Sequence, residues 1–390
     1  MTTADTATED EPAWATQSLD IGAAGTALLH IERARTGHGS WKAAHAWIAR
    51  ASAHDLNGSL TAGLFLGAPA VAFVLHAAAD PPERYQVARE TLDRHVRDIA
   101  HQRADSALTR IASGQPTRFH EYDLLYGLTG IGALLLRTQP DSTALEHVLT
   151  YVVALTRPVE HHGQQLPGWW VGHGTRWHDG AYHGPHHLNL GVAHGITGPL
   201  LLLSQAARRR LIVPGHLDAI QTITGWLKRW QQAGPTGAWW PETITLPEIT
   251  AGQPGQRRAA RPSWCYGTPG IARAGQLASL ALGDEEQQRG YEQALADCLT
   301  DPAQLQQITD AGLCHGWAGV YQTVWRAAQD AVTPRLAPLL PTLGQQLTSH
   351  ADSRSGEGFL NGAAGTGLAV ATHTTKQPPV SGWDTCLLID

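Results

Sequence analysis

Two cysteines and a histidine stand beside glycine motifs in the second half of the sequence. Cys265 lies two residues before a Gly-x-x-Gly segment that begins at Gly267, and Cys314 and His315 immediately precede another that begins at Gly316. Two thiols and an imidazole bind zinc well, and three protein ligands leave a fourth position open, as in catalytic zinc sites. If the two segments lie side by side in the fold, the sequence predicts a zinc site. Otherwise both cysteines are ordinary buried residues, as free thiols often are.

Residues suited to proton transfer and charge stabilisation occupy similar places. His194 stands directly before a third Gly-x-x-Gly segment, Asp123 lies four residues before a fourth, and Arg261 lies four residues before Cys265. An imidazole transfers protons near neutral pH, a carboxylate can orient it, and a guanidinium keeps its charge beside an oxyanion. A lone histidine is more often a satisfied core residue, and a lone aspartate a helix cap. Because four successive segments carry polar residues towards one face, we expect His194 and Asp123 to be catalytic.

The glycine segments belong to a repeat that runs through the whole sequence. The pattern is Gly-x-x-Gly followed by an apolar run, and it occurs seven times, with Ala70 replacing the second glycine of the second copy. The copies begin at Gly22, Gly67, Gly127, Gly195, Gly267, Gly316 and Gly362. The shortest intervals, 45 and 46 residues, leave room for two helices and their turns. At the turn positions, the first and last repeats carry Ile21 and Asn361.

Amphipathic stretches alternate with the apolar runs. Apolar residues at helical spacing occur in two of them, namely Leu92, Val96 and Ile99, and then Leu217, Ile220, Leu227 and Trp230. Apolar helices need burial on all sides, whereas amphipathic helices need water on one side. A ring of seven two-helix repeats, with the apolar helices inside, meets both needs. The sequence therefore predicts an all-α fold, an α/α toroid forming a single domain over residues 1–390, with an open solenoid as the alternative.

Two of the longer intervals contain insertions. One spans about residues 158–190 and is dense in Gly, His, Pro and Trp, and the other spans about residues 233–262. Neither shows helical periodicity, and residues 243–247 alternate like a short strand. The seven histidines from His161 to His187 follow no recognised metal-ligand spacing, so we interpret this segment as a substrate-facing rim.

Composition excludes several classes of protein. The chain of 390 residues has 28 basic and 34 acidic residues, and this balance does not favour a nucleic-acid partner. Four cysteines do not make a disulfide framework, so we expect a reducing cytoplasm, with Cys298 and Cys386 merely buried. Residues 1–14 are predicted to be disordered. The apolar run at 62–79 contains proline and histidine, which favours a buried helix over a membrane span.

Several motifs together resemble the lanthionine cyclase (LanC) family. They are TrpCysTyrGly-x-ProGly, CysHisGly-x-x-Gly, AlaHisGly-x-x-Gly and the seven glycine repeats, and they cover essentially the whole chain. The resemblance implies an α/α toroid with one zinc ion in its central cavity, held by Cys265, Cys314 and His315. It also implies catalytic roles for His194 and Asp123, with Arg261 and Tyr266 lining the site.

The resemblance further implies an activity. A zinc-dependent lanthionine synthetase adds peptide cysteine thiols to dehydroalanine or dehydrobutyrine, which forms (methyl)lanthionine thioether rings in lanthipeptides (lantibiotics). Its partners would be a dehydrated precursor peptide, a separate dehydratase, and export or protease components that could bring it to a membrane. Two alternatives remain open: a LanC-like protein that binds or transfers glutathione, and a non-catalytic toroid with structural zinc.

Overall fold

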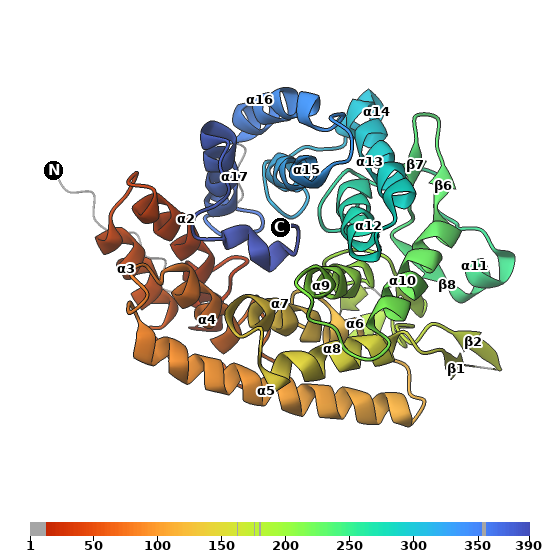
Figure 1. Ribbon diagram of the computed structural model, residues 1–390, viewed down its shortest axis with the longest axis horizontal. Coiled ribbons are helices and arrows are strands. Elements are labelled where there is room, and N and C mark those ends of the chain that lie inside the picture. The colour runs from red at the N-terminus through yellow and green to blue at the C-terminus, as the bar shows by residue number, and fades with distance from the viewer. Residues whose placement is uncertain (1–12, 162, 175, 179–180, 353–355) are drawn as a thin grey trace.

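Two concentric layers of helices form a closed ring (Figure 1), seen in a computed structural model that describes residues 13–161, 163–174, 176–178, 181–352 and 356–390. The inner helices are α2 (Ala23–Arg35), α4 (Ala68–Ala77), α7 (Leu128–Thr138), α9 (Thr197–Arg208), α12 (Thr268–Leu282), α15 (Trp317–Asp330) and α17 (Ala363–Thr375). The outer helices are α3 (Trp41–Ala51), α5 (Gln86–Ala112), α8 (Thr143–Leu155), α10 (His216–Trp230), α13 (Glu285–Thr300) and α16 (Leu340–His350). The expected all-α toroid is confirmed.

The inner helices are largely buried, as their apolar sequences require, and α17 is the most exposed of them. In α4, every residue except His76 is buried, so the apolar run at 62–79 contributes a core helix. The imidazole Nε2 of His76 lies 2.8 Å from a carboxylate oxygen of Asp93 on α5, which satisfies the polar side chain. Among the described residues, no helix combines the length and apolar character needed to cross a membrane.

Each outer helix buries one face, and one residue that was expected on a buried face is exposed. In α10, Ile220, Leu227 and Trp230 are buried as predicted, whereas Leu217 is 43% exposed. The preceding residue, His216, is buried instead, and its Nε2 bonds to the carbonyl of Leu203 at 2.8 Å. At about 100° per residue, His216 lies in the middle of the buried stripe, so its neighbour turns towards solvent.

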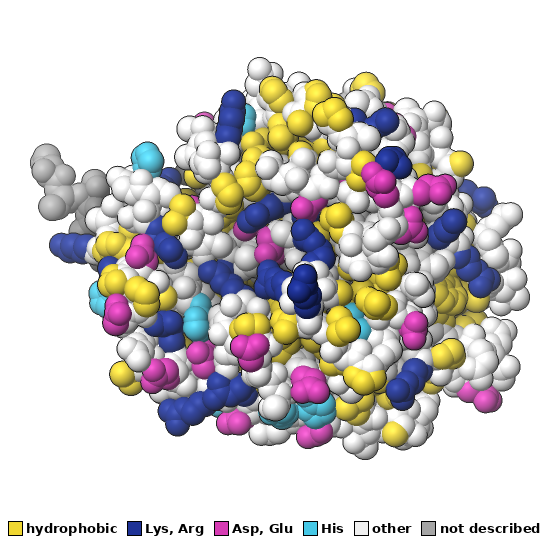
Figure 2. Space-filling model, viewed as in Figure 1, with side chains coloured by type: hydrophobic (Ala, Val, Ile, Leu, Met, Phe, Trp, Pro, Cys, Tyr) yellow, Lys and Arg dark blue, Asp and Glu magenta, His cyan; other side chains and the backbone are white. Residues whose placement is uncertain are grey.

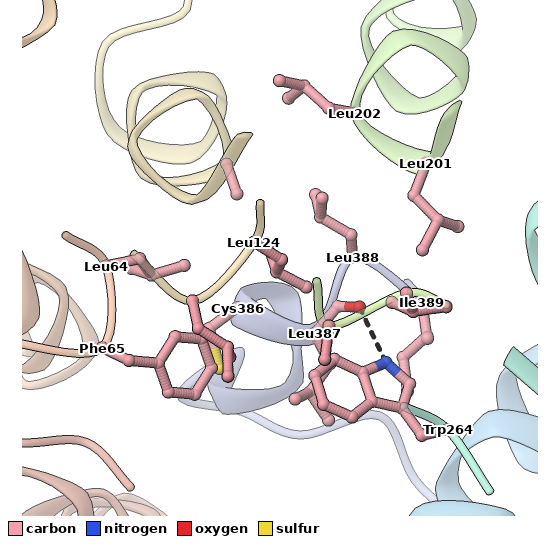
Figure 3. Close-up of a cluster of buried hydrophobic side chains, with 14 of the residues drawn as sticks. Leu64, Phe65, Leu124, Leu201, Leu202, Trp264, Cys386, Leu387, Leu388 and Ile389 are labelled. Carbon is pink, nitrogen blue, oxygen red and sulfur yellow. Dashed lines mark hydrogen bonds between the residues drawn. The ribbon is translucent and has the colours of Figure 1, made fainter. Parts of the chain in front are cut away.

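The last repeat differs from the expected helix pair. After α17, Pro378 and Pro379 prevent a further helix, and the chain continues through the short 3₁₀ helix η2 (Trp383–Leu387). Residues 383–389 enter the middle of the ring, where Leu387 and Leu388 lie among side chains of inner helices and turns (Figure 3). The ring is therefore closed in its centre by its own chain.

Basic side chains anchor this central segment at the C-terminal ends of the inner helices. Arg137 at the end of α7 donates to the carbonyl of Ser381, and Arg326 on α15 pairs with Asp384 at 2.7 Å. Lys and Arg side chains gather around the centre of this face, near the C-terminal residue (Figure 2). Cations suit this end, because helix C-termini carry partial negative charge.

At the opposite end, the seven turns are joined into what we call the turn collar. In each turn, a backbone N–H donates to a carbonyl of the next turn. The accepting residue lies two places before the first glycine of that next turn. The bonds run from Leu19 to Phe65, Phe65 to Leu125, Leu124 to Ala193, Val192 to Cys265, Cys265 to Cys314, Cys314 to Leu360, and Phe359 to Asp20, with N···O distances of 2.7–3.2 Å. The circuit is closed, so each turn is fixed relative to both neighbours.

The second glycine of each motif lets the inner helix pack onto its own turn. A Cβ at Gly270 would lie 2.0 Å from the carbonyl oxygen of Trp264, far inside van der Waals contact. The second repeat tolerates Ala70 because its turn has another shape: Gly67 there adopts φ 78°, which favours glycine. The degenerate copy is thus a different turn that no longer needs the second glycine.

Gly270→Ala is expected to lower the free energy of unfolding by about 1–3 kcal/mol, because the added methyl group overlaps backbone that cannot move away. Gly290→Ala is the matched control, since Gly290 lies within α13 with nothing within 4 Å of its would-be Cβ. The control should gain about 0.5–1 kcal/mol from helix propensity. Urea unfolding measures both, and equal stability of the two variants would contradict the packing argument.

The two insertions contain short strands, and one strand of the first insertion pairs with one strand of the second. The strands are β1 (Val159–His161), β2 (Gln164–Leu166), β3 (Arg176–His178), β4 (Ala181–His183), β5 (His187–Asn189), β6 (Gln232–Ala233), β7 (Ala238–Trp239) and β8 (Thr243–Thr245). β5 from the first insertion pairs antiparallel with β8 from the second. The strand expected at 243–247 is shorter, because a capping box between Thr245 and Glu248 starts α11 (Leu246–Ala251).

Four further short helices complete the described chain. They are α1 (Ala13–Thr16), α6 (Phe119–Tyr122), α14 (Pro302–Leu305) and the 3₁₀ helix η1 (Ala337–Leu339). Of residues 1–14, predicted to be disordered, residues 1–12 lie outside the described part, and Ala13 and Trp14 belong to α1.

Candidate active site

Cys265, Cys314 and His315 come together on adjacent turns of the collar. One ligand atom from each lies within 4.8 Å of the others, and the backbone N–H of Cys265 donates to the carbonyl of Cys314 at 3.2 Å. A tetrahedral zinc ion with bonds of about 2.0–2.3 Å separates its ligand atoms by about 3.5 Å, so small rotations of these side chains suffice. Two thiols and an imidazole also match the ligand preference of zinc. These residues therefore fit a zinc ion with one open position.

The two thiols influence each other's ionisation. A hydrogen bond with the Cys314 thiol holds the pKa of Cys265 well below its usual range, against the opposing effect of burial. The same hydrogen bond and burial raise the pKa of Cys314. One thiolate thus forms readily, whereas a second negative charge beside it needs a compensating cation. In contrast, burial raises the pKa of Cys298 to about 12, and neither Cys298 nor Cys386 belongs to this cluster.

His194 and Asp123 form a second candidate pair beside the Cys/Cys/His cluster. The Nδ1 of His194 lies 2.6 Å from Oδ2 of Asp123, whose side chain is fully buried. The other carboxylate oxygen accepts the backbone N–H groups of Tyr126 and Gly127 at 2.8 and 2.7 Å. Asp123 therefore both caps a turn and orients an imidazole. Because a carboxylate accepts, Nδ1 of His194 carries a proton, and in the neutral imidazole Nε2 therefore keeps a lone pair.

Tyr266 connects this pair to the metal cluster. Its ring centroid lies 6.4 Å from that of His194, and its phenol oxygen accepts a hydrogen bond from the Asn189 side chain at 3.0 Å. Burial raises the pKa of Tyr266, so the phenol keeps its proton and remains a donor. Gly191 makes room for the ring, since a Cβ there would lie 2.7 Å from two ring carbons.

Arg261 reaches the cluster through a residue that the sequence analysis missed. Its guanidinium lies 3.6 Å from a carboxylate oxygen of Asp310, and the same oxygen lies 3.7 Å from Nε2 of His315. Asp310 thus links Arg261 to the candidate metal ligand His315. Asp310, like Asp123, precedes its glycine motif by a few residues, and this shared placement was the signal that could have identified it.

Aromatic and imidazole rings extend from the site to the first insertion. Phe119 places its ring 5.1 Å from His194 and 5.2 Å from His173, measured between centroids. Burial lowers the pKa of His173, and lowers that of His187 to about 4, so both are neutral at physiological pH. His173 therefore brings a neutral imidazole of the His-rich segment next to Phe119 and the site. The side chains of His162, His178 and His183 are not among those that the structure describes.

The paired helices form an α/α toroid. Its turn collar carries both a Cys/Cys/His cluster, which is a candidate zinc centre, and a His–Asp pair. Residues 13–388 match the family described as "Lanthionine synthetase C-like protein", and the chain belongs to this family.

Two further comparisons agree with this assignment. The chain is 23% identical over 326 residues to the nisin biosynthesis protein NisC of Lactococcus lactis subsp. lactis, a match that covers 80% of this chain and 74% of that protein. It also matches a solved structure of nisin cyclase with a TM-score of 0.80 at 20% identity, over 96% of this chain and 93% of that one. At this identity, the structural match shows a shared fold.

Proposed function

We propose that the protein is a zinc-dependent cyclase that closes thioether rings in dehydrated precursor peptides during lanthipeptide biosynthesis. The observation that carries this proposal is the combination on one collar of three zinc-type ligands within 4.8 Å and a His–Asp pair at 2.6 Å. Membership of the lanthionine synthetase C-like family supports it, as does the similarity to a nisin biosynthesis protein.

The metal ligands would prepare the nucleophile. A zinc ion held by Cys265, Cys314 and His315 would supply an open position at which a substrate cysteine thiol loses its proton near neutral pH. The sulfur electron pair then forms a bond to the β-carbon of dehydroalanine or dehydrobutyrine. The carbon–carbon π electrons move to the neighbouring carbonyl as an enolate, and a proton added at the α-carbon completes the (methyl)lanthionine.

The other site residues would transfer protons and stabilise charge. His194 Nε2 is the free atom of the oriented imidazole, so it accepts the thiol proton or, once protonated, delivers one to the α-carbon. Asp123 stabilises the imidazolium form. Arg261 stabilises the developing enolate oxygen, and Tyr266 donates its phenol hydrogen within the same site.

The proposal also assigns partners and a compartment. A separate enzyme would dehydrate serine and threonine in the precursor peptide. Export or protease components of the same biosynthetic complex would then act on the cyclised product. We place the protein in the cytoplasm, with membrane association through such partners.

A linear peptide with one cysteine and one dehydroalanine tests this function. Ring closure leaves the peptide mass unchanged but removes the thiol, so the product should resist alkylation by N-ethylmaleimide. Added glutathione separates the main alternative, because its addition to dehydroalanine raises the mass by one glutathione. Loss of alkylation with unchanged mass supports the cyclase. Glutathione adducts without ring closure would support the alternative, and no reaction of either kind would contradict both enzymatic functions.

A further inference from the structure

Two neighbouring turns of the collar hold a side chain of the following turn in the same way. In the third turn, Asp123 bonds through one oxygen to the backbone of its own turn and through the other to His194 of the fourth turn. Asn189 repeats this arrangement one turn further on. Its Oδ1 accepts the N–H of Gly191 in its own turn at 3.0 Å, and its Nδ2 donates to the phenol oxygen of Tyr266 in the fifth turn at 3.0 Å. Both side chains that are held in this way stand directly before the first glycine of their turn.

The amide of Asn189 is fixed in place and in orientation. The residue is 2% exposed, and Gly195 makes room for it, since a Cβ at Gly195 would lie 2.5 Å from Oδ1 of Asn189. The backbone N–H of Gly191 needs an acceptor, so the amide oxygen faces this N–H and the NH₂ group faces Tyr266. The direction of the bond to the phenol follows: Asn189 donates and Tyr266 accepts.

This bond determines where the phenol hydrogen of Tyr266 can point. The NH₂ group of an amide only donates, so the phenol hydrogen points away from Asn189 and remains available to another group in the site. The backbone beside the tyrosine is also fixed, because the N–H groups of Val192 and Ala193 bond to the carbonyl of Cys265 at 2.7 and 3.3 Å. The fourth turn therefore holds both the backbone and the hydroxyl group of this residue.

We propose that Asn189 is a positioning residue that directs the phenol hydrogen of Tyr266 towards the reacting groups of the substrate. Asp123 and Asn189 perform the same task with opposite chemistry. The carboxylate accepts from the imidazole of His194 and leaves Nε2 free, whereas the amide donates to the phenol and leaves its hydrogen free. A donor that is already aimed at a developing enolate oxygen needs no reorganisation when charge appears there. The inference rests on the proposed function, because it assigns a residue to that reaction.

Asn189→Asp reverses the hydrogen bond and keeps the shape of the side chain. One carboxylate oxygen still accepts the N–H of Gly191, whereas the other accepts the phenol hydrogen of Tyr266 and withdraws it from the substrate. The kcat for ring closure should fall by about 10²-fold, as for loss of one stabilising donor, with little change in KM. Tyr266→Phe should show a similar loss. The double variant should lose no more than either single variant, because Asn189 acts through the phenol.

Asn57→Asp is the matched control. Oδ1 of Asn57 also accepts a backbone N–H two residues further on, that of Ser59 at 3.1 Å, and no hydrogen bond between Asn57 and a tyrosine occurs in the described part of the chain. This variant should keep the parent kcat. Parent-level kcat in Asn189→Asp would overturn the inference. The same would follow if Asn189→Asp lowered kcat in the Tyr266→Phe background by as much as in the parent, because Asn189 would then act independently of the phenol.

A measurement without turnover separates this inference from the proposed function. The ¹³Cζ resonance of Tyr266, assigned by its absence from Tyr266→Phe, depends on whether the phenol oxygen accepts a hydrogen bond. It should shift in Asn189→Asp and stay in place in Asn57→Asp. An unshifted resonance in Asn189→Asp would overturn the inference even if the parent closes rings. If the parent closes no ring, the cyclase is overturned, whereas the shift would still support the control of this phenol by Asn189.

Discussion

Cys314→Ala is expected to abolish stoichiometric zinc binding while the helical ring stays folded. The parent protein should contain about one zinc ion per chain, because three ligand atoms converge and the two neighbouring thiols oppose full ionisation without a cation. Removing a direct ligand should weaken zinc binding by more than the roughly 10–100-fold that follows loss of a supporting residue. Metal analysis and circular dichroism of both proteins measure the two effects.

The collar explains why the fold should survive this change. Cys314 joins its neighbours through its backbone N–H and carbonyl, and alanine keeps both groups. Cys298→Ala is the matched control: this cysteine is buried in α13 away from the cluster, so the variant should keep its zinc. Absence of zinc from the parent protein after metal-replete purification would contradict the site. Unfolding of Cys314→Ala would indicate a structural metal instead.

Asp123→Asn is expected to lower kcat for ring closure by about 10²–10⁴-fold with little change in stability. The amide oxygen can still accept the N–H groups of Tyr126 and Gly127, so the turn remains capped. The amide NH₂ now faces Nδ1 of His194 and donates to it. This moves the imidazole proton to Nε2, and the atom that should exchange protons loses its lone pair.

Two measurements distinguish this mechanism from a structural defect. The ¹⁵N chemical shifts of the His194 ring should show the opposite tautomer in the variant, while the zinc content stays at the parent level. Asp284→Asn is the control, because Asp284 caps a helix with its side chain and, in the described part of the chain, has no hydrogen bond or ion pair with a histidine. If Asp123→Asn retained full kcat with the switched tautomer, His194 would not transfer the proton.

Repetition explains how much of this architecture could be predicted from the sequence. The glycine motif marks the start of each inner helix, so its period locates the seven helices and puts Cys265 beside Cys314. The Asp123–His194 pair could be predicted for the same reason, since adjacent turns must meet in a ring. In α10, periodicity predicted that Leu217 is buried, but His216 takes the buried position instead. A histidine can be buried there because the carbonyl of Leu203 accepts its N–H.

Features that depend on contacts between distant segments could not be predicted. The place of Asp310 before a glycine motif could mark it as a candidate, but no pattern within either segment indicates its contact with Arg261 from another turn. The central position of residues 383–389 rests on contacts such as that between the Trp264 indole and the carbonyl of Leu387, which are 123 residues apart. Such pairings follow from the three-dimensional closure of the ring and leave no local period.

The closed circuit of the turn collar also bears on how such a protein can diversify. Intervals between the glycine motifs range from 45 to 72 residues, yet each turn lies one hydrogen bond from the next. The spacing of Cys265 and Cys314 is therefore set by the collar and not by the length of chain that joins their turns. Segments between turns can lengthen, shorten or be exchanged without displacing the reactive centre. The architecture thus separates the turns that hold the candidate site from the segments that join them.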